Sequence, residues 1–352
     1  MAADIDTIMR HAPILAASDL FLREGEYAHA RLDDRFQAFS KDPITREAME
    51  KFWRHLGADP ARDLDHDASY VGPDGARFRV SLHRHCGRLG AILRRLRHDV
   101  PHIEGLGLPV DELRKWVGRS PGLIMVCGPT GSGKSTTMAA LLDEINHNNA
   151  LHIVTIEDPI EFVFEQGSSL VTQRQVGVDT ASFADGIRSA LRQGVDLIMV
   201  GEVRDRETAE AVLNATETGH LVLTTLHNKG VLDAIERFGL FFDSAETANR
   251  MTVLSHVLIG LIAQRLVTGM HGEPVLLTEH LEVEGAVRGW IEERDHHALK
   301  DFMARRDKGD NRSFTDSALA ALEAGRIDQE TARASVGRSQ DLDRALRGVS
   351  AG

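Results

Sequence analysis

The sequence predicts an α/β protein in which a parallel sheet is preceded by a smaller α/β module and followed by a helical segment. Three observations support this prediction. From Pro121 onward, apolar runs of strand length alternate with runs of helical periodicity, as in a parallel sheet covered on both faces. The buried-strand pattern at 123–127 leads into a glycine-rich stretch at 128–135 and then into a helical run. After residue 280 the pattern changes to a series of short helices.

Composition limits the possible functions. The 352 residues suffice for two domains of ordinary globular composition. A formal net charge of −12 argues against a protein that coats nucleic acid through bulk charge. With only Cys86 and Cys127, neither a disulfide framework nor a four-cysteine zinc site is possible. No stretch approaches the roughly 18 apolar residues of a membrane span, and residues 1–6 lack signal-peptide features, so we expect a cytoplasmic protein.

Residues 1–97 are predicted to form the first domain. Thr45 is placed to cap a helix whose apolar residues recur at helical spacing as far as Leu56. Asp33 and Asp34 form a turn, and 72–75 is a strong hairpin signal. Strands are expected at 18–22, 27–32, 36–39, 69–71, 76–82 and 90–93.

Seven arginines lie between Arg77 and Arg97 with no acidic residue among them. One interpretation is a solvated strand face. The others are contact with nucleic acid, or reach toward a nucleotide bound elsewhere in an assembly, since a guanidinium pairs well with phosphate. Only Phe78 is interleaved with the arginines, which disfavours a stacking platform for single strands. The nearby His83, His85 and Cys86 lack further ligands, so no metal site is predicted there.

Residues 98–109 contain glycine and proline and are predicted to link the domains. The second domain is expected at 110–280, opening with a helix at 110–117, and a helical segment and tail at 281–352. Within the second domain we expect further strands at 151–156, 196–202 and 221–226, and helices at 183–192, 206–218 and 247–266.

The stretch from 128 to 135 has the pattern G-x-x-x-x-G-K-S between a strand and a helix. In this context the glycines let backbone N–H groups converge on phosphate oxygens, and the helix N-terminus adds partial positive charge. Lys134 would reach the terminal phosphates and Ser135 would ligate Mg²⁺. The sequence therefore predicts an ATP site formed by Gly128, Pro129, Thr130, Gly131, Ser132, Gly133, Lys134, Ser135 and Thr136.

Three carboxylates are predicted at strand ends near this loop: Glu157, Glu161 and Glu202. ATP hydrolysis needs one acidic group to support Mg²⁺ and another to orient or deprotonate the attacking water. Glu157 and Glu202 are predicted metal residues, and Glu161 and Glu202 are predicted catalytic residues. His220 and His227 bracket one strand and are predicted to respond to hydrolysis at the γ-phosphate.

Four arginines are candidates for stabilising charge on the transferring phosphoryl group, within one chain or across a subunit boundary. They are Arg188, Arg192, Arg204 and Arg206. We take Arg192 and Arg204 as the catalytic candidates.

Four sequence blocks resemble those of the type II/type IV secretion ATPases in order and spacing. They are GPTGSGKST at 128–136, the acidic box TIEDPIEF at 155–162, the divergent Walker B segment LIMVGEVRD at 197–205 and the histidine box ETGHLVLTTLH at 217–227. The acidic and histidine boxes together are highly specific, whereas the P-loop alone would not be.

Within that superfamily the chain is most similar to the PilT-like type IV pilus retraction ATPases, to roughly residue 335. The N-terminal similarity lies in ASDLFLREGE at 17–26, GARFRVS at 75–81, GAILRRL at 90–96 and the linker IEGLGLP at 103–109. This resemblance implies a PAS-like N-terminal domain at 1–97 and a RecA-like P-loop ATPase core at 110–280.

The resemblance also implies a homo-hexameric ring in which ATP binds between one core and the next subunit's N-terminal domain. Arg94 would then face the nucleotide. For Arg77 and Arg79, the same arrangement favours a nucleotide-facing role over a solvated strand face. His220 and His227 correspond to the paired histidines of the family.

Matching the family's motifs to this sequence also implies roles for four residues of the core. Lys134 and Ser135 would bind phosphate and Mg²⁺, Glu202 would support the metal, and Glu161 would activate water. The ring would do mechanical work on an inner-membrane platform protein, from the cytoplasmic face of that membrane. Contact with the membrane would then be indirect, and nucleic acid is not an expected partner.

Three positions depart from the family pattern. Gly194-Val195 replaces the usual Asp-Pro before the Walker B strand, and Asn228 replaces the Thr after the histidine box. The C-terminal helix reads Ala-Val-Arg-Gly-Trp-Ile at 286–291 instead of Ala-Ile-Arg-Asn-Leu-Ile. The resemblance predicts pilus retraction and twitching motility despite these departures. Three alternatives stay open: the ATPase of a conjugation-type type IV secretion system, a nucleic-acid translocase on the same core, and a slow nucleotide-gated switch.

Overall fold

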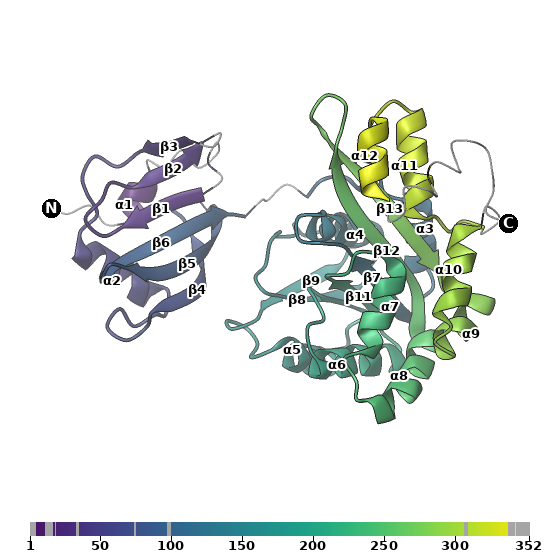
Figure 1. Cartoon of the computed structure of the whole chain (residues 1–352). Helices are drawn as coiled ribbons and strands as arrows, with labels where there is room; N and C mark the ends of the chain where they lie inside the picture. Colours follow the sequence, from purple (N-terminus) through teal and green to yellow (C-terminus); the bar gives the residue numbers. More distant parts are fainter. Residues whose placement is uncertain are drawn as a thin grey trace. The chain divides into compact units, whose positions relative to one another are not determined.

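The computed structural model describes residues 5–10, 17, 19–32, 35–73, 75–96, 100–305, 309–336 and 342. The chain forms two compact units, Met1–Asp99 and Val100–Gly352 (Figure 1). Asp33, Asp34, Arg97 and most of the predicted tail after residue 335 lie outside the described residues. None of the helices in the described ranges combines the length and apolar composition needed to traverse a lipid bilayer.

The first unit is an antiparallel sheet of six strands in the order β3-β2-β1-β6-β5-β4. Its strands are β1 (Asp19–Arg23), β2 (His29–Leu32), β3 (Arg35–Ala38), β4 (Asp65–Val71), β5 (Arg77–His85) and β6 (Arg88–Arg95), and its helices are α1 (Ile5–Met9) and α2 (Arg46–His55). Both helices pack on one face, where Met49 and Trp53 meet the buried alternate residues of β5 and β6. Thr45 caps α2 as predicted, because its Oγ1 accepts from Ala48 N at 3.2 Å.

The second unit is built on a seven-stranded sheet in the order β13-β12-β7-β11-β10-β8-β9. All neighbouring strands are parallel except the antiparallel pair of β12 and β13. The strands are β7 (Gly122–Cys127), β8 (His152–Glu157), β9 (Leu170–Gln175), β10 (Leu197–Val200), β11 (Leu221–Leu226), β12 (Leu258–Thr268) and β13 (Pro274–Glu282).

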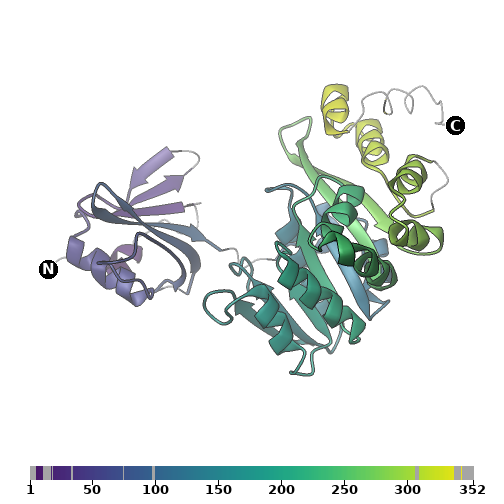
Figure 2. The ribbon, with the colours of Figure 1, turned by 60° about the horizontal axis from the view of Figure 1, so that its bottom comes forward.

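Helices cover both faces of this sheet (Figures 1 and 2). They are the 3-10 helix η1 (Ile103–Leu106), α3 (Val110–Val117), α4 (Lys134–Asn148), α5 (Phe183–Ala190), α6 (Arg206–Glu217), α7 (Val231–Gly239), α8 (Ser244–Val257), α9 (Ala286–Glu292), α10 (His296–Ala304), α11 (Phe314–Glu323) and α12 (Gln329–Ser335). The last four helices form the predicted C-terminal helical segment and pack with α8, β12 and β13.

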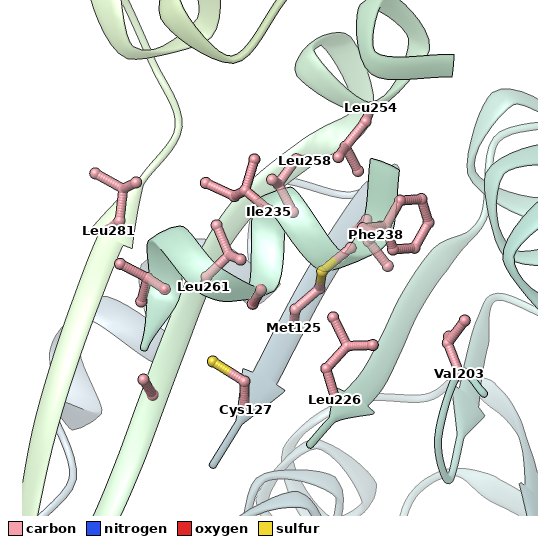
Figure 3. Close-up of a cluster of buried hydrophobic side chains, with 14 of the residues drawn as sticks. Met125, Cys127, Val203, Leu226, Ile235, Phe238, Leu254, Leu258, Leu261 and Leu281 are labelled. Carbon is pink, nitrogen blue, oxygen red and sulfur yellow. The ribbon is translucent and has the colours of Figure 1, made fainter. Parts of the chain in front are cut away.

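Strand β7 lies at the centre of this unit and all six of its residues are buried. Met125 and Cys127 point to one face, where they join side chains of α7, α8 and β12 (Figure 3). Ile124 and Val126 point to the other face, against α3 and α4. Burial on both faces explains why the strand is a continuous apolar run without alternation.

Two sequence predictions differ from this fold. The helix predicted at 247–266 is wrong beyond Val257, where α8 ends and β12 begins. Residues 258–263 are buried on both faces of the sheet, and a continuous apolar run has no periodicity that separates strand from helix. Part of the predicted linker also packs on the second unit, since Ile103 and Leu108 are buried beside Trp116.

Candidate nucleotide-binding and catalytic site

The P-loop follows β7 at the edge where the parallel strands end. Parallel strands bring their carboxyl ends to one edge, the usual ligand edge of open α/β sheets. The loop starts at Gly128, where any Cβ would lie 2.4 Å from Ser132 Oγ and 2.6 Å from Gln264 O. Only glycine allows this close approach of the loop to β12.

The loop ends at the N-terminus of α4, which offers open backbone donors. Its N-cap, Gly133, has φ 90° and no side chain to bond the first amides. Ser132 Oγ is buried and has no hydrogen-bond partner among the described residues, and Ser135 is exposed in the first turn. Open amides, an unpartnered hydroxyl and a glycine-only approach fit a bound phosphate group.

Lys134 lies in the same loop with 8% of its surface exposed. Its Nζ donates to Gly128 O at 2.9 Å and to Pro129 O at 3.1 Å. Burial lowers the pKa of Lys134, and the nearby negative charges of Glu202 and Glu161 oppose that effect. The ammonium therefore has carbonyl partners but no ion pair among the described residues, and a phosphate would supply the missing charge.

Glu202 follows β10 and is held by an imidazole and a guanidinium. Its Oε2 lies 3.2 Å from Nε2 of His227, and its Oε1 pairs with the guanidinium of Arg204. Arg204 also reaches Asp158 at 3.6 Å. The predicted residues Glu202, His227 and Arg204 are thus brought together at the P-loop edge, with Asp158 joining them.

Glu157 ends β8 but does not present a free carboxylate at this edge. It is 7% exposed, and its Oε1 accepts from Thr155 Oγ1 at 2.6 Å and from Gln173 Nε2 at 3.2 Å. Burial raises the pKa of Glu157 to about 7, although both hydrogen bonds lower it. In this structure burial and internal hydrogen bonds occupy the Glu157 carboxyl, and its role as a Mg²⁺ ligand stays a prediction.

Glu161 lies in the connection between β8 and β9 and is exposed. Its backbone N–H points to Glu157 Oε2 at 3.5 Å, and its charge acts on the pKa of Lys134. Among the three predicted carboxylates, Glu161 therefore combines exposure with proximity to the P-loop lysine.

His220 does not join this site within one chain. It precedes β11, and its backbone carbonyl accepts from Gly122 N at the start of β7. His227 follows the same strand, which places the two histidines at opposite edges of the sheet, about 20 Å apart at the rise of a β-strand. Within one chain the two predicted histidines therefore lie apart, and a role for His220 at a nucleotide stays a prediction.

Three candidate arginines are also remote from the P-loop edge or engaged in local ion pairs. Arg192 lies between α5 and the start of β10, at the amino edge of the sheet, where its Nη1 donates to Arg188 O at 2.8 Å. Arg188 pairs with Asp185 at 3.1 Å. Arg206 begins α6 and pairs with Glu210, Asp243 and Glu246. Within one chain only Arg204 of the four lies beside Glu202.

The predicted arginines of the first unit lie on its sheet. Arg94 Nε donates to the buried Asp19 at 2.9 Å, and Arg79 pairs with Asp67 at 3.8 Å. Arg77 is exposed at the start of β5. A role for Arg77, Arg79 and Arg94 at a nucleotide stays a prediction.

Two residues at the P-loop edge were not identified as site residues from the sequence. Asp158 lies inside the acidic box and could have been found there, as a second carboxylate within reach of Arg204. Gln173 is a polar residue on a strand and carries no sequence signal. It contacts the acidic box only because β9 pairs with β8 in the register that sets Thr155 opposite Gln173.

This site defines a P-loop ATPase core: a phosphate loop, a buried lysine and two carboxylates at one edge of a parallel sheet. Residues 79–300 match the family described as Type II/IV secretion system protein. The chain therefore belongs to the type II/IV secretion system protein family, and it is an ATPase of that family.

Individual relatives agree with this assignment. The chain is 38% identical over 296 residues to the type IV pilus retraction ATPase PilT of Pseudomonas aeruginosa, covering 82% of this chain and 86% of PilT. It is 36% identical to a twitching motility protein of Neisseria gonorrhoeae, covering 80% of this chain and 75% of that protein. A crystal structure of the pilus retraction motor PilT with bound ADP matches with a TM-score of 0.88 at 36% identity, over 97% of this chain and 99% of that one.

Proposed function

We propose that this chain is a ring-forming, Mg²⁺-dependent ATPase whose hydrolysis of ATP drives type IV pilus retraction and twitching motility. One observation carries the proposal. The charges of Glu202 and Glu161 act on the pKa of Lys134 in the P-loop, in a chain that is 38% identical to a pilus retraction ATPase over 82% of its length. The site supports the ATPase chemistry, and the likeness over most of the chain supports the mechanical task.

The loop from Gly128 to Thr136 binds the phosphates of ATP through its backbone N–H groups and Lys134. Ser135 and Glu202 hold Mg²⁺, which when bound supplies neutralisation of the phosphate charge. Glu161 orients the attacking water and accepts its proton. Positioning and charge stabilisation then supply most of the acceleration, as in other phosphoryl transfers.

Arg204 and His227 connect Glu202 to the progress of hydrolysis. The guanidinium of Arg204 and Nε2 of His227 both contact the Glu202 carboxylate, which is the group that would help to hold Mg²⁺. Were Mg²⁺ bound, Glu202 would help to hold it, and the guanidinium of Arg204 would then be available for the phosphoryl group, in its own site or in a neighbour's. His227, whose Nε2 lies 3.2 Å from Glu202 Oε2, would connect that carboxylate to α7, which starts four residues later.

The assembled form is a homo-hexamer in which Arg77, Arg79 and Arg94 face the nucleotide of an adjacent subunit, and Arg192 acts at the same boundary. The ring works on an inner-membrane platform protein from the cytoplasmic face. A composite site of this kind makes turnover per subunit rise with protein concentration. Turnover that is independent of concentration under monomeric conditions would show that one chain holds a complete site.

Three variants test the ATPase site. Lys134→Ala should abolish both nucleotide binding and turnover, whereas Glu202→Gln and Glu161→Gln should retain binding and lose turnover by at least about 100-fold. Glu165→Gln, an exposed carboxyl on the same connection, is the matched control and should behave as wild type. Wild-type turnover in Glu161→Gln or Glu202→Gln would refute the assignment of that carboxylate.

A secretion system is the second candidate for the machine that is served. The family description includes secretion proteins, and α9 departs from the retraction pattern at Gly289 and Trp290, where the Trp290 ring packs against Phe302 at 5.6 Å. Deletion of the chain separates the two candidates. Loss of twitching motility with normal export supports retraction, and loss of export or DNA transfer with normal twitching supports secretion.

A further inference from the structure

We propose that Gln173 is a positioning residue for Glu161, because its side-chain amide holds the segment that carries the catalytic carboxylate against strand β9. The proposal rests on the role of Glu161 in the proposed function. Gln173 lies outside the P-loop, acidic, Walker B and histidine blocks. It therefore adds a residue from a different strand to the catalytic apparatus.

The amide of Gln173 makes three hydrogen bonds to the acidic box and the residues just after it. Nε2 donates to Phe162 O at 2.8 Å and to Glu157 Oε1 at 3.2 Å. Oε1 accepts from Phe164 N at 3.2 Å. Both N–H groups and one acceptor position are thus used, so the side chain contacts the connection before and after Glu161.

The chemistry of these contacts requires an amide. A carboxylate at this position would meet the carbonyl of Phe162 and the carboxyl of Glu157 without a donor of its own. An apolar side chain would remove the bonds to Phe162 and Phe164 and leave Glu157 Oε1 with Thr155 Oγ1 alone. Because donor and acceptor are in one planar group, Gln173 bonds the C=O of Phe162 and the N–H of Phe164 as a neighbouring strand would.

These hydrogen bonds of Gln173 fix the backbone on both sides of Glu161. On the N-terminal side, Glu157 Oε2 accepts a hydrogen bond from Glu161 N at 3.5 Å, and Glu157 Oε1 accepts one from Gln173 Nε2. On the C-terminal side, Phe162 is the next residue and is buried. Glu161 itself is exposed, so its place relative to Lys134 depends on its backbone more than on packing of its side chain. A displacement of about 1 Å at such a carboxylate can cost about 100-fold in rate.

The test uses Gln173→Met and Gln173→Glu in the full chain under assembly conditions, with Gln166→Met and Gln166→Glu as controls. Gln166 is an exposed glutamine seven residues before Gln173, on the connection between β8 and β9 that also carries Glu161. We expect kcat to fall about 10- to 100-fold in both Gln173 variants while KM for ATP and the Kd for ADP change less than about twofold. Amide exchange of the peptide 158–164 should accelerate, and that of β7 and α4 should not.

A double-mutant cycle separates positioning from general destabilisation. If Gln173 acts through Glu161, then Gln173→Met should add less than about twofold to the loss already caused by Glu161→Gln. Full additivity, an unchanged kcat in the Gln173 variants, or an equal loss of ADP binding would overturn the proposal. Wild-type turnover in Glu161→Gln would instead refute the proposed catalytic role, so the two failures are distinguishable.

Discussion

Glu157→Gln should remove a pH dependence from the stability of the second unit. Glu157 is 7% exposed, and burial raises its pKa from 4.5 to about 7. Between these two values the folded chain holds a proton that the unfolded chain releases. The contribution of Glu157 to stability is therefore most favourable below about pH 4.5 and falls as the pH rises through 7. Glutamine keeps the shape and an acceptor oxygen but cannot ionise.

The magnitude follows from the two pKa values. The interval from 4.5 to about 7 corresponds to about 3 kcal/mol of unfolding free energy. At pH 8 the Glu157→Gln chain should therefore be more stable than wild type by as much as about 3 kcal/mol. At pH 5 the advantage should shrink to within about 1 kcal/mol, because the wild-type carboxyl is then mostly protonated in the folded chain.

The assay must report on the second unit alone, since the chain has two units. Urea titrations at pH 5, 6, 7 and 8 can be followed by a brief exchange pulse at one fixed pH, with mass spectrometry of peptides from β8 and β9. Glu165 is exposed on the connection between β8 and β9, and the unfolding free energy of Glu165→Gln should run parallel to that of wild type at every pH. Parallel curves for wild type and Glu157→Gln from pH 5 to 8 would refute the reasoning.

Three further substitutions test other parts of the structure. Gly128→Ala should abolish ADP binding in a fluorescence titration, because its Cβ would lie 2.6 Å from a β12 carbonyl oxygen, and retained affinity would refute the tight approach. Glu279→Ala should cost about 1–3 kcal/mol in urea unfolding of the second unit, since this half-buried carboxyl accepts from Val231 N at 2.9 Å and Phe314 N at 3.5 Å at the starts of α7 and α11. Thr45→Ala should cost the first unit about 1 kcal/mol through loss of the α2 cap, measured in the same way, and Thr45→Ser should recover most of it.

Features that depend on local backbone chemistry could be predicted from the sequence. The P-loop is one, because its glycines, its lysine and the flanking strand and helix are contiguous. The α2 cap is another, since Thr45 bonds an amide three residues away. The order and type of most elements of the second unit follow from apolar runs and their lengths in the same way.

Features that depend on which strands pair could not be predicted in this way. The run at 258–266 has the apolar content of a buried helix or a buried strand, and the choice is made by pairing with β7 on one side and β13 on the other. The contact of Gln173 with the acidic box needs the register of β8 against β9. The separation of His220 from His227, by contrast, follows from the length of the strand between them and could have been inferred beforehand.

The three glutamates at strand ends look alike in the sequence, but their surroundings assign them different tasks. Glu157 is buried and hydrogen-bonded to Thr155 and Gln173, so ionising it is costly and it serves the backbone of the acidic box. Glu202 is held by the guanidinium of Arg204 and the imidazole of His227. Glu161 is exposed and close enough to Lys134 to act on its pKa. An exposed carboxylate of this kind is the one of the three that could meet water beside a phosphate, which is why we propose Glu161 for the water-activating role and expect its position to affect the rate of the chemical step.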